Sequence, residues 1–316
     1  MIFETITAFA ALIVGIVLMA YSSDKAVDHS VKIASALRIS PLIIGLVLVS
    51  IGTDLPEIVN SIISCAVGHA DIELGDSLGS VLTQMTLVIG LLPFLAGKFK
   101  VKKKEVLIIG ACEVLALILA VSIAEKGYFT RINALFLVAS WPVFILLTRS
   151  ATKRNPKEKE YATAHTNKRR LHHFAIATLG FVGVAVGAYV VIQSVIKLSA
   201  VFHISEYLIS FFVMSIGTSL PELIVELIAL RKKQYELAIG DAIGSCLVDA
   251  TVSVGIGQLF FPQAVSGGTA MITGLYAIFG SIVVVLTLAL RERVDKKAGA
   301  LFILIYLLSY ALLGVT

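Results

Sequence analysis

Two copies of one short motif place acidic side chains inside long apolar segments. Residues 50–57 read Ser-Ile-Gly-Thr-Asp-Leu-Pro-Glu, and residues 215–222 read Ser-Ile-Gly-Thr-Ser-Leu-Pro-Glu. An acid near the centre of a lipid bilayer costs roughly 2.5–3.5 kcal/mol, whereas a typical helix cap contributes roughly 1 kcal/mol. A capping box therefore does not by itself account for Glu57 and Glu222. Coordination of a cation by these carboxylates is the interpretation that we favour.

The proline of each motif is expected to break a helix. Proline donates no backbone hydrogen bond and collides with the carbonyl four residues earlier, here that of Gly52 or Gly217. We therefore expect each span to split and to free carbonyls around Ser50–Thr53 and Ser215–Thr218. Freed backbone is tolerated in a membrane only where it is buried in protein or lines a cavity. With the threonine hydroxyls and glutamate carboxylates, these carbonyls form the oxygen-rich environment that Ca²⁺ and other hard cations prefer.

A second pair of segments repeats with the same spacing. Residues 73–82 read Glu-Leu-Gly-Asp-Ser-Leu-Gly-Ser-Val-Leu, and residues 238–247 read Ala-Ile-Gly-Asp-Ala-Ile-Gly-Ser-Cys-Leu. Both pairs are offset by 165 residues, so that Pro56 corresponds to Pro221. Two matches in one register indicate an internal duplication.

The second pair of segments adds further oxygen donors. On a helix, Ser80 and Gln84 lie one turn apart on the same face, as do Ser245 and Asp249. We therefore expect these side chains to extend the site that begins at the two glutamates.

Further acids lie within the apolar segments. Asp76 and Asp241 come one turn before the two serines, and direct ligation and a structural role remain equally open for them. Glu226 follows Glu222 by four residues and is a weaker candidate for the same pathway. No role is assigned to Glu113.

The composition is that of an integral membrane protein. The chain has 316 residues, 58% of them hydrophobic and 15% charged, with a mean hydropathy of +0.94; soluble domains carry about 25% charged residues. The segment 1–21 has no basic start and is interpreted as a retained helix. The net charge of +5 is interpreted as a sign of topology and not of nucleic-acid binding. The cysteines, expected to be inert packing residues, are Cys65, Cys112 and Cys246.

The apolar runs predict ten transmembrane helices. Their expected ranges are 2–21, 33–67, 72–97, 105–124, 130–148, 174–196, 204–230, 236–261, 268–290 and 299–315. The second run is too long for one straight span, so we expect a short preceding helix near 27–38.

Basic residues gather on one side of these spans. They cluster in segments 98–104, 149–173, 231–233 and 291–297. The positive-inside rule then places both termini outside the cell membrane and the loop in the cytoplasm. Since each half carries five spans, the two halves have opposite orientations, an architecture typical of secondary transporters. The expected units are a first repeat at 1–148, a basic loop at 149–173 and a second repeat at 174–316.

At these motifs the chain resembles the calcium/cation antiporter superfamily, and most closely its prokaryotic Na⁺/Ca²⁺ exchanger branch. The resemblance rests on residues 52–57 and 217–222, the two Gly-Ser pairs that end at Ser80 and Ser245, and Asp249. It implies exchange of Ca²⁺ for Na⁺ without a cofactor. Spans two, three, seven and eight would surround the cation sites, and spans one and six would slide across them. The ligands that it implies are Glu57, Glu222, Asp249, Thr53, Thr218, Ser219, Ser50, Ser215, Ser80 and Ser245; Asp54 and Gln84 complete the predicted set.

The chain departs from the family pattern at several ligand positions. Serine is usual where Asp54 stands, and asparagine is usual at Asp76, Asp241 and Gln84; an acid at Glu226 is unusual. The centre therefore holds four carboxylates instead of three, and crowded carboxylates repel one another. Coupling to H⁺ or K⁺ on the same fold remains the alternative to Ca²⁺/Na⁺ exchange.

Other function classes fit less well. Gly75-Asp76 and Gly240-Asp241 superficially resemble part of an intramembrane aspartyl protease motif, but the glycine that should precede each pair is missing. A channel remains possible, and no P-loop for ATP is found. We therefore expect a non-enzymatic transporter. Its partners are inorganic cations and the lipid bilayer, with no nucleic acid and no obligatory protein partner evident.

Overall fold

A computed structural model describes residues 2–34, 44–151 and 167–313, and the statements below concern these residues. The described chain is helical apart from two short strands, and four segments (η1–η4) are π-helical. In chain order the elements are α1 (Ile2–Ala34), η1 (Ile44–Val49), α3 (Ser50–Thr53), α4 (Leu55–Ala66), α5 (Ala70–Leu82), η2 (Thr83–Val88), α6 (Ile89–Leu95), β1 (Phe99–Lys100), α7 (Lys103–Ala124), α8 (Arg131–Ala151), α9 (Asn167–Phe202), α10 (Glu206–Ile209), η3 (Ser210–Met214), α11 (Ser215–Thr218), α12 (Leu220–Arg231), α13 (Tyr235–Val248), η4 (Asp249–Ser253), α14 (Val254–Phe260), α15 (Gly267–Arg291), β2 (Arg293–Val294) and α16 (Lys296–Leu313).

The duplication seen in the motifs extends along the fold. When the bounds of α3, α4 and α6 are shifted by 165 residues, they coincide with those of α11, α12 and α14. The π-helical segments follow the same shift, η1 onto η3 and η2 onto η4, to within one residue at each end. The π-helical turn is a rare conformation that often marks functional sites. Its recurrence at equivalent positions indicates that both halves share one local architecture.

Eight helical stretches of the described chain are long and apolar enough to cross a membrane. They are Thr5–Ser22, Ala70–Leu95, Lys103–Ala124, Arg131–Thr148, Thr178–Phe202, Glu206–Arg231, Tyr235–Phe260 and Gly267–Arg291. The other two expected spans correspond to the η1–α4 segment, which is interrupted at Asp54, and to α16.

The first helix is longer than the sequence suggested. We expected a span ending near residue 21 and a separate helix near 27–38, but α1 continues without interruption to Ala34. The polar residues at 22–25 include no proline or glycine, and polar side chains alone do not end a helix. The rest of the expected short helix lies outside the described residues. Its counterpart α9 is equally extended, with 36 residues.

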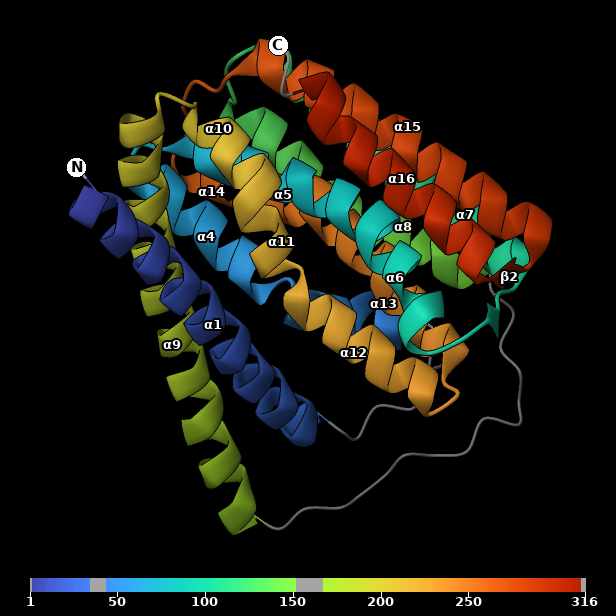
Figure 1. The fold of residues 1–316 in the computed structure, drawn as a ribbon. Helices are drawn as coiled ribbons and strands as arrows, with labels where there is room; N and C mark the ends of the chain where they lie inside the picture. The colour runs from blue at the N-terminus through green and yellow to red at the C-terminus, as the bar shows by residue number, and fades with distance from the viewer. Residues whose placement is uncertain (1, 35–43, 152–166, 314–316) are drawn as a thin grey trace.

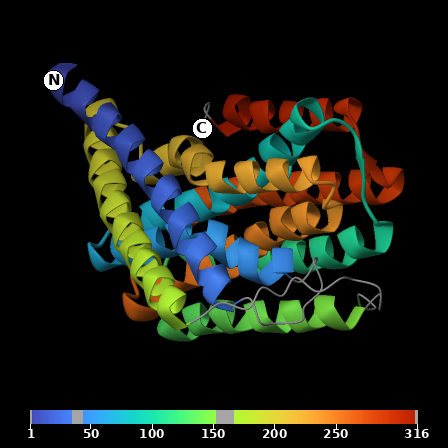
Figure 2. The ribbon, with the colours of Figure 1, turned by 90° about the horizontal axis from the view of Figure 1, so that it is seen from below.

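The spans differ in how deeply they are buried in the molecule. Within the apolar 18-residue window of each stretch, 78% of the residues are buried in Ala70–Leu95 and 89% in Tyr235–Phe260. The share is 28% in Thr5–Ser22. Helices α1 and α9 pack side by side along one flank of the bundle (Figures 1 and 2). Spans three and eight therefore lie in the core of the molecule, and spans one and six border it.

Two glycines allow the core helices to approach the π-helical segments of the opposite half. A Cβ atom on Gly79 would lie 2.4 Å from the carbonyl oxygen of Phe211, and one on Gly244 would lie 2.9 Å from Cα of Leu46. The two contacts are equivalent under the 165-residue shift. Because the obstructing atoms belong to backbone, they cannot move aside without moving a helix.

We therefore expect Gly79→Ala to destabilise the protein. Overpacking of a close interface typically costs about 1–3 kcal/mol, which a lower midpoint of thermal unfolding in detergent would show. Gly268→Ala is the matched control, since no atom lies within 4 Å of its added Cβ. An unfolding midpoint of Gly79→Ala equal to that of the wild type would show that this contact does not constrain the packing.

Short strands join the ends of the spans. Strands β1 and β2 pair antiparallel, with Phe99 opposite Val294, and an isolated bridge joins Tyr128 to Ala264. Asp295, which follows β2, accepts a hydrogen bond from the backbone amide of Ala298 at 3.0 Å. This bond, together with the nearby arginines, holds the pKa of Asp295 below its usual value.

Candidate functional site

Each motif interrupts its helix at a single residue. Asp54 and Ser219 separate α3 from α4 and α11 from α12, with nearly equal backbone angles of φ −75°, ψ 7° and φ −81°, ψ 5°. The carbonyl of Ser50 still accepts the Asp54 amide at 2.9 Å, and that of Ser215 accepts the Ser219 amide at 3.1 Å. The expectation that these two carbonyls are freed is therefore wrong. The backbone N–H that each proline lacks would have bonded to the carbonyl of Gly52 or Gly217. Each of these glycines lies two residues after the serine.

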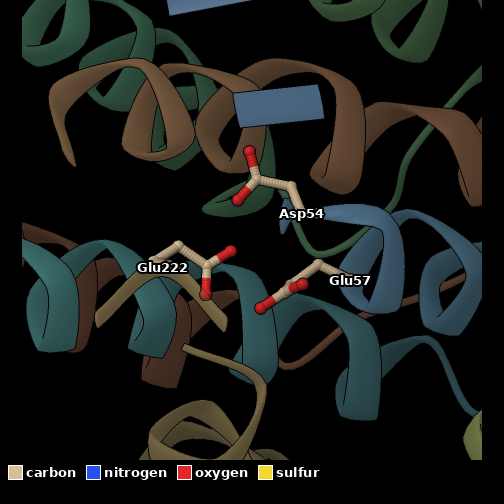
Figure 3. Close-up of side chains that lie close together, drawn as sticks. All are labelled: Asp54, Glu57 and Glu222. Atoms are coloured by element: carbon tan, nitrogen blue, oxygen red, sulfur yellow. The ribbon is translucent and has the colours of Figure 1, made fainter. Parts of the chain in front are cut away.

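Three carboxylates converge beside these interruptions (Figure 3). Oxygen atoms of Asp54, Glu57 and Glu222 lie within 4.8 Å of one another, and all three side chains are buried. Asp54 comes from the α3–α4 junction, Glu57 from the first turn of α4 and Glu222 from the first turn of α12. The two halves of the chain thus contribute to one group of acids, which we call the carboxylate cluster.

Hydrogen bonds within the described part of the protein do not compensate the buried carboxylates of this cluster. Within the part of the chain that the structure describes, none of its carboxylate oxygens has a hydrogen-bond partner, and neither Asp54 nor Ser219 forms a side-chain cap. The capping-box interpretation therefore finds no support. Buried charges without partners cost several kcal/mol each, so a dehydrated cation between these oxygens would remove a large electrostatic penalty.

Hydroxyl groups join the two halves on either side of the cluster. Thr53 Oγ1 lies 3.3 Å from Ser245 Oγ, and Ser80 Oγ lies 3.3 Å from Thr218 Oγ1. The 165-residue shift exchanges these two pairs. All four residues were predicted as ligands from the sequence, and the structure places them in two equivalent contacts.

The remaining predicted residues border the same region. The Gln84 amide donates to Asp249 Oδ2 at 3.3 Å, and the Asp249 charge acts on both Asp54 and Glu57. Asp249 nevertheless lies outside the group of three carboxylates. The hydroxyl of Ser219 is buried and has no hydrogen-bond partner among the described residues.

Two polar contacts of the site were not anticipated. Asn60 donates to Asp76 Oδ2 at 3.0 Å, and Thr218 donates to Asp76 Oδ1 at 3.0 Å. The spacing of Asn60, three residues after Glu57, was the available sign that both share a helix face. Cys246, expected to be inert packing, is buried and contacts Gln84 Oε1 at 3.3 Å. Of the two contacts of Asp76, the one with Thr218 joins the first half of the chain to the second.

A protein-family model described as sodium/calcium exchanger protein matches residues 7–149 and 172–315. The chain belongs to the sodium/calcium exchanger family. Among curated members, the putative antiporter CaxA of Alkalimonas amylolytica is 27% identical over 309 residues, covering 94% of this chain and 95% of the relative. The sodium/calcium exchanger MaX1 of Methanosarcina acetivorans is 23% identical, covering 94% and 96%. The inner membrane protein YrbG of Escherichia coli is 30% identical, covering 81% and 80%.

A solved structure of the sodium/calcium exchanger family has the same fold. The exchanger NCX_Mj, soaked with Na⁺ and Sr²⁺, is similar with a TM-score of 0.66 and 25% identity, covering 96% of this chain and 97% of the other. The prediction of an all-α, multi-pass membrane fold with two inverted repeats is thereby confirmed. As a member of the sodium/calcium exchanger family, the protein is a cation antiporter and not an enzyme, and the aspartyl protease alternative no longer applies.

Proposed function

We propose that this antiporter exchanges Ca²⁺ for Na⁺ at the carboxylate cluster. The observation that carries the proposal is the convergence of Asp54, Glu57 and Glu222 within 4.8 Å, buried and without protein partners. Clustered carboxylates with nearby hydroxyls form a hard, oxygen-only ligand set that suits Ca²⁺. The names of MaX1 and NCX_Mj as sodium/calcium exchangers support the same ion pair.

The proposed ligands are of two kinds: the carboxylates, and the hydroxyl and carbonyl groups around them. Carboxylates provide the charge, and the hydroxyls of the two halves complete the coordination of whichever cation is bound. The carbonyls of Ser50 and Ser215 keep a second lone pair for this purpose, because each carbonyl oxygen can accept two bonds. The full set is Glu57, Glu222, Asp54, Asp249, Thr53, Thr218, Ser219, Ser50, Ser215, Ser80, Ser245 and Gln84.

Charge neutralisation supplies the coupling between the two ions. The empty cluster carries several negative charges in a dry environment, and moving it past an apolar barrier is costly. Binding of Ca²⁺ or of Na⁺ lowers that cost, so the protein changes its access side only when loaded. Because both ions use the same oxygens, one cation must leave before the other binds.

The peripheral helices are placed to control access. Helix α1 packs against α3 and α11, the two short helices that precede the interruptions, and α9 packs against α4. We propose that α1 and α9 slide as a pair across these helices and open the cluster to one side of the membrane at a time. The proposed repeats, 1–148 and 174–316, are joined by the loop at 149–173.

The proposed direction of transport follows from the distribution of basic residues. With both termini outside and the loop at 149–173 in the cytoplasm, the chain would export Ca²⁺ across the plasma membrane against an inward Na⁺ gradient. Coupling to H⁺ or K⁺ is the second candidate. It is favoured by the presence of Asp249 beside the three clustered acids, since four carboxylates exceed the charge of one Ca²⁺.

Proteoliposome fluxes with three independent gradients test the proposal. We expect ⁴⁵Ca²⁺ uptake into Na⁺-loaded vesicles, with no uptake when K⁺ or H⁺ gradients replace the Na⁺ gradient. Uptake that follows the pH or K⁺ gradient alone would contradict Na⁺ coupling and establish the second candidate. Unitary currents in planar bilayers would contradict exchange altogether and indicate a channel.

A further inference from the structure

A second pair of buried acids lies on the hairpin formed by α12 and α13. Glu226 is in α12, one turn after Glu222, and Asp241 is in α13. The two helices pack against each other, and the two carboxylates are near enough for their charges to repel. At a rise of about 1.5 Å per residue, the pair is displaced about 6 Å from Glu222 toward the loop that joins the two helices.

These two acids are as poorly satisfied as those of the carboxylate cluster. Both side chains are fully buried, and none of their four carboxylate oxygens has a hydrogen-bond partner among the residues that the structure describes. No ion pair between these acids and a basic side chain occurs in the described parts of the chain. They also lie outside the group formed by Asp54, Glu57 and Glu222.

The first half of the chain shows how an acid at this position can be satisfied by the protein. Asp76, the counterpart of Asp241, accepts hydrogen bonds from Asn60 and Thr218. In the second half Val225 replaces the asparagine, and the next residue is Glu226. A donor has thus been exchanged for an apolar side chain, and a second acid has been added.

No basic side chain among the described residues forms an ion pair with these acids, and hydroxyl groups lie beside one of them. The hydroxyls of Ser50 and Thr53 are polar neighbours of Asp241. Two carboxylates and two hydroxyls again form an oxygen-only set, which selects hard metal cations over soft ones. In the equivalent region of the first half, the acid already accepts two hydrogen bonds, and the buried Glu73 accepts one from Ser77 at 3.0 Å through Oε1.

We propose that Glu226 and Asp241 hold a second metal cation, one helical turn from the carboxylate cluster and on one side of it only. The proposal rests on the proposed cation-exchange function and adds a staging site to one of its two access routes. A cation that enters from the α12–α13 side pauses at this pair before it reaches the cluster. A cation that enters from the opposite side meets Asp76, whose two oxygens each already accept a hydrogen bond, from Asn60 and from Thr218.

Counting bound ions tests the proposal. Equilibrium dialysis of the purified protein measures ⁴⁵Ca²⁺ bound per chain without Na⁺, and ²²Na⁺ bound per chain without Ca²⁺. We expect Glu226→Gln and Asp241→Asn each to bind one cation fewer per chain than the wild type in at least one of the two experiments. Asp76→Asn is the matched control at the equivalent position, and it is expected to keep the full count.

A Glu57→Gln background separates this proposal from the proposed function. With the cluster disabled, one cation per chain should remain and should be lost when Glu226→Gln is added. If Ca²⁺ is not a substrate, the wild type binds no ⁴⁵Ca²⁺ and the proposed function fails. The number of ²²Na⁺ ions bound per chain then decides whether the second site exists. Monodisperse elution of each variant verifies folding, and Glu226→Asp provides a second variant that keeps the charge. Equal counts of both isotopes in the wild type, Glu226→Gln and Asp241→Asn would overturn the second site.

Discussion

Replacing Glu57 or Glu222 by glutamine is expected to reduce Ca²⁺ exchange strongly. Glutamine keeps the shape of the side chain but removes the charge that compensates for dehydration of the cation. A charge-assisted contact is worth roughly 1.5–3 kcal/mol, and about 1.4 kcal/mol corresponds to a tenfold change in affinity. The apparent Ca²⁺ affinity should therefore fall by about 10- to 100-fold. Initial rates of Na⁺-dependent ⁴⁵Ca²⁺ uptake in proteoliposomes measure this loss.

Glu113→Gln is a suitable control for these two substitutions. Glu113 is another fully buried membrane acid, but it lies in α7 and accepts a hydrogen bond from Ser281 of α15 at 2.9 Å. Loss of a carboxylate there should leave exchange near the wild-type rate. Robust exchange by Glu57→Gln or Glu222→Gln would refute the assignment of the carboxylate cluster as the transport site.

Asp54→Ser is expected to shift the ion preference away from Ca²⁺ while the protein remains folded. Serine already occupies the equivalent position, Ser219, with nearly the same backbone angles, so the backbone accepts it. A divalent ion interacts with each carboxylate twice as strongly as a monovalent ion does. At an effective dielectric constant of about 20, two unit charges 4 Å apart interact by about 4 kcal/mol. Allowing for reduced repulsion among the remaining acids, we expect Ca²⁺ to lose at least about tenfold in affinity relative to Na⁺.

The reciprocal substitution gives a direct test of this explanation. Combining Asp54→Ser with Ser219→Asp restores the number of carboxylates and moves one of them to the other half. If charge count sets the ion preference, the double variant should recover most of the Ca²⁺ affinity. Competition between ⁴⁵Ca²⁺ and unlabelled Na⁺ measures the preference, and the thermal unfolding midpoint in detergent verifies folding. Unchanged Ca²⁺ affinity, Na⁺ dependence and pH profile in Asp54→Ser would show that Asp54 does not tune selectivity.

Most of the fold was accessible from the sequence because it depends on repetition and on burial. A shift of 165 residues related both motif pairs, and the same shift relates the helices that carry them. Acids placed in apolar spans have few energetically acceptable positions, so their convergence could be predicted without coordinates. Asp54, Glu57 and Glu222 meet in the structure for this reason.

The details that depend on competing local effects could not be predicted. Proline removes one hydrogen bond but does not decide how far the disturbance spreads, and the interruption is limited to Asp54 and Ser219. The length of α1 was underestimated because polar residues at its end resemble a loop while remaining compatible with a helix. The contact of Asn60 with Asp76 depends on the angle between two helices, which motif spacing does not give.

The two equivalent hydroxyl contacts, Thr53 with Ser245 and Ser80 with Thr218, bear on the reversibility of the transport cycle. In the proposed transport cycle, a cation that leaves the cluster in either direction would pass a hydroxyl contact of the same kind, so the forward and backward movements would share similar steps. A carrier does not change the equilibrium of the coupled exchange that it carries out, and the two proposed access routes have similar construction. The asymmetry of the α12–α13 hairpin can change how readily each entrance captures an ion at low concentration. Net direction is then decided by the ion gradients that the cell maintains.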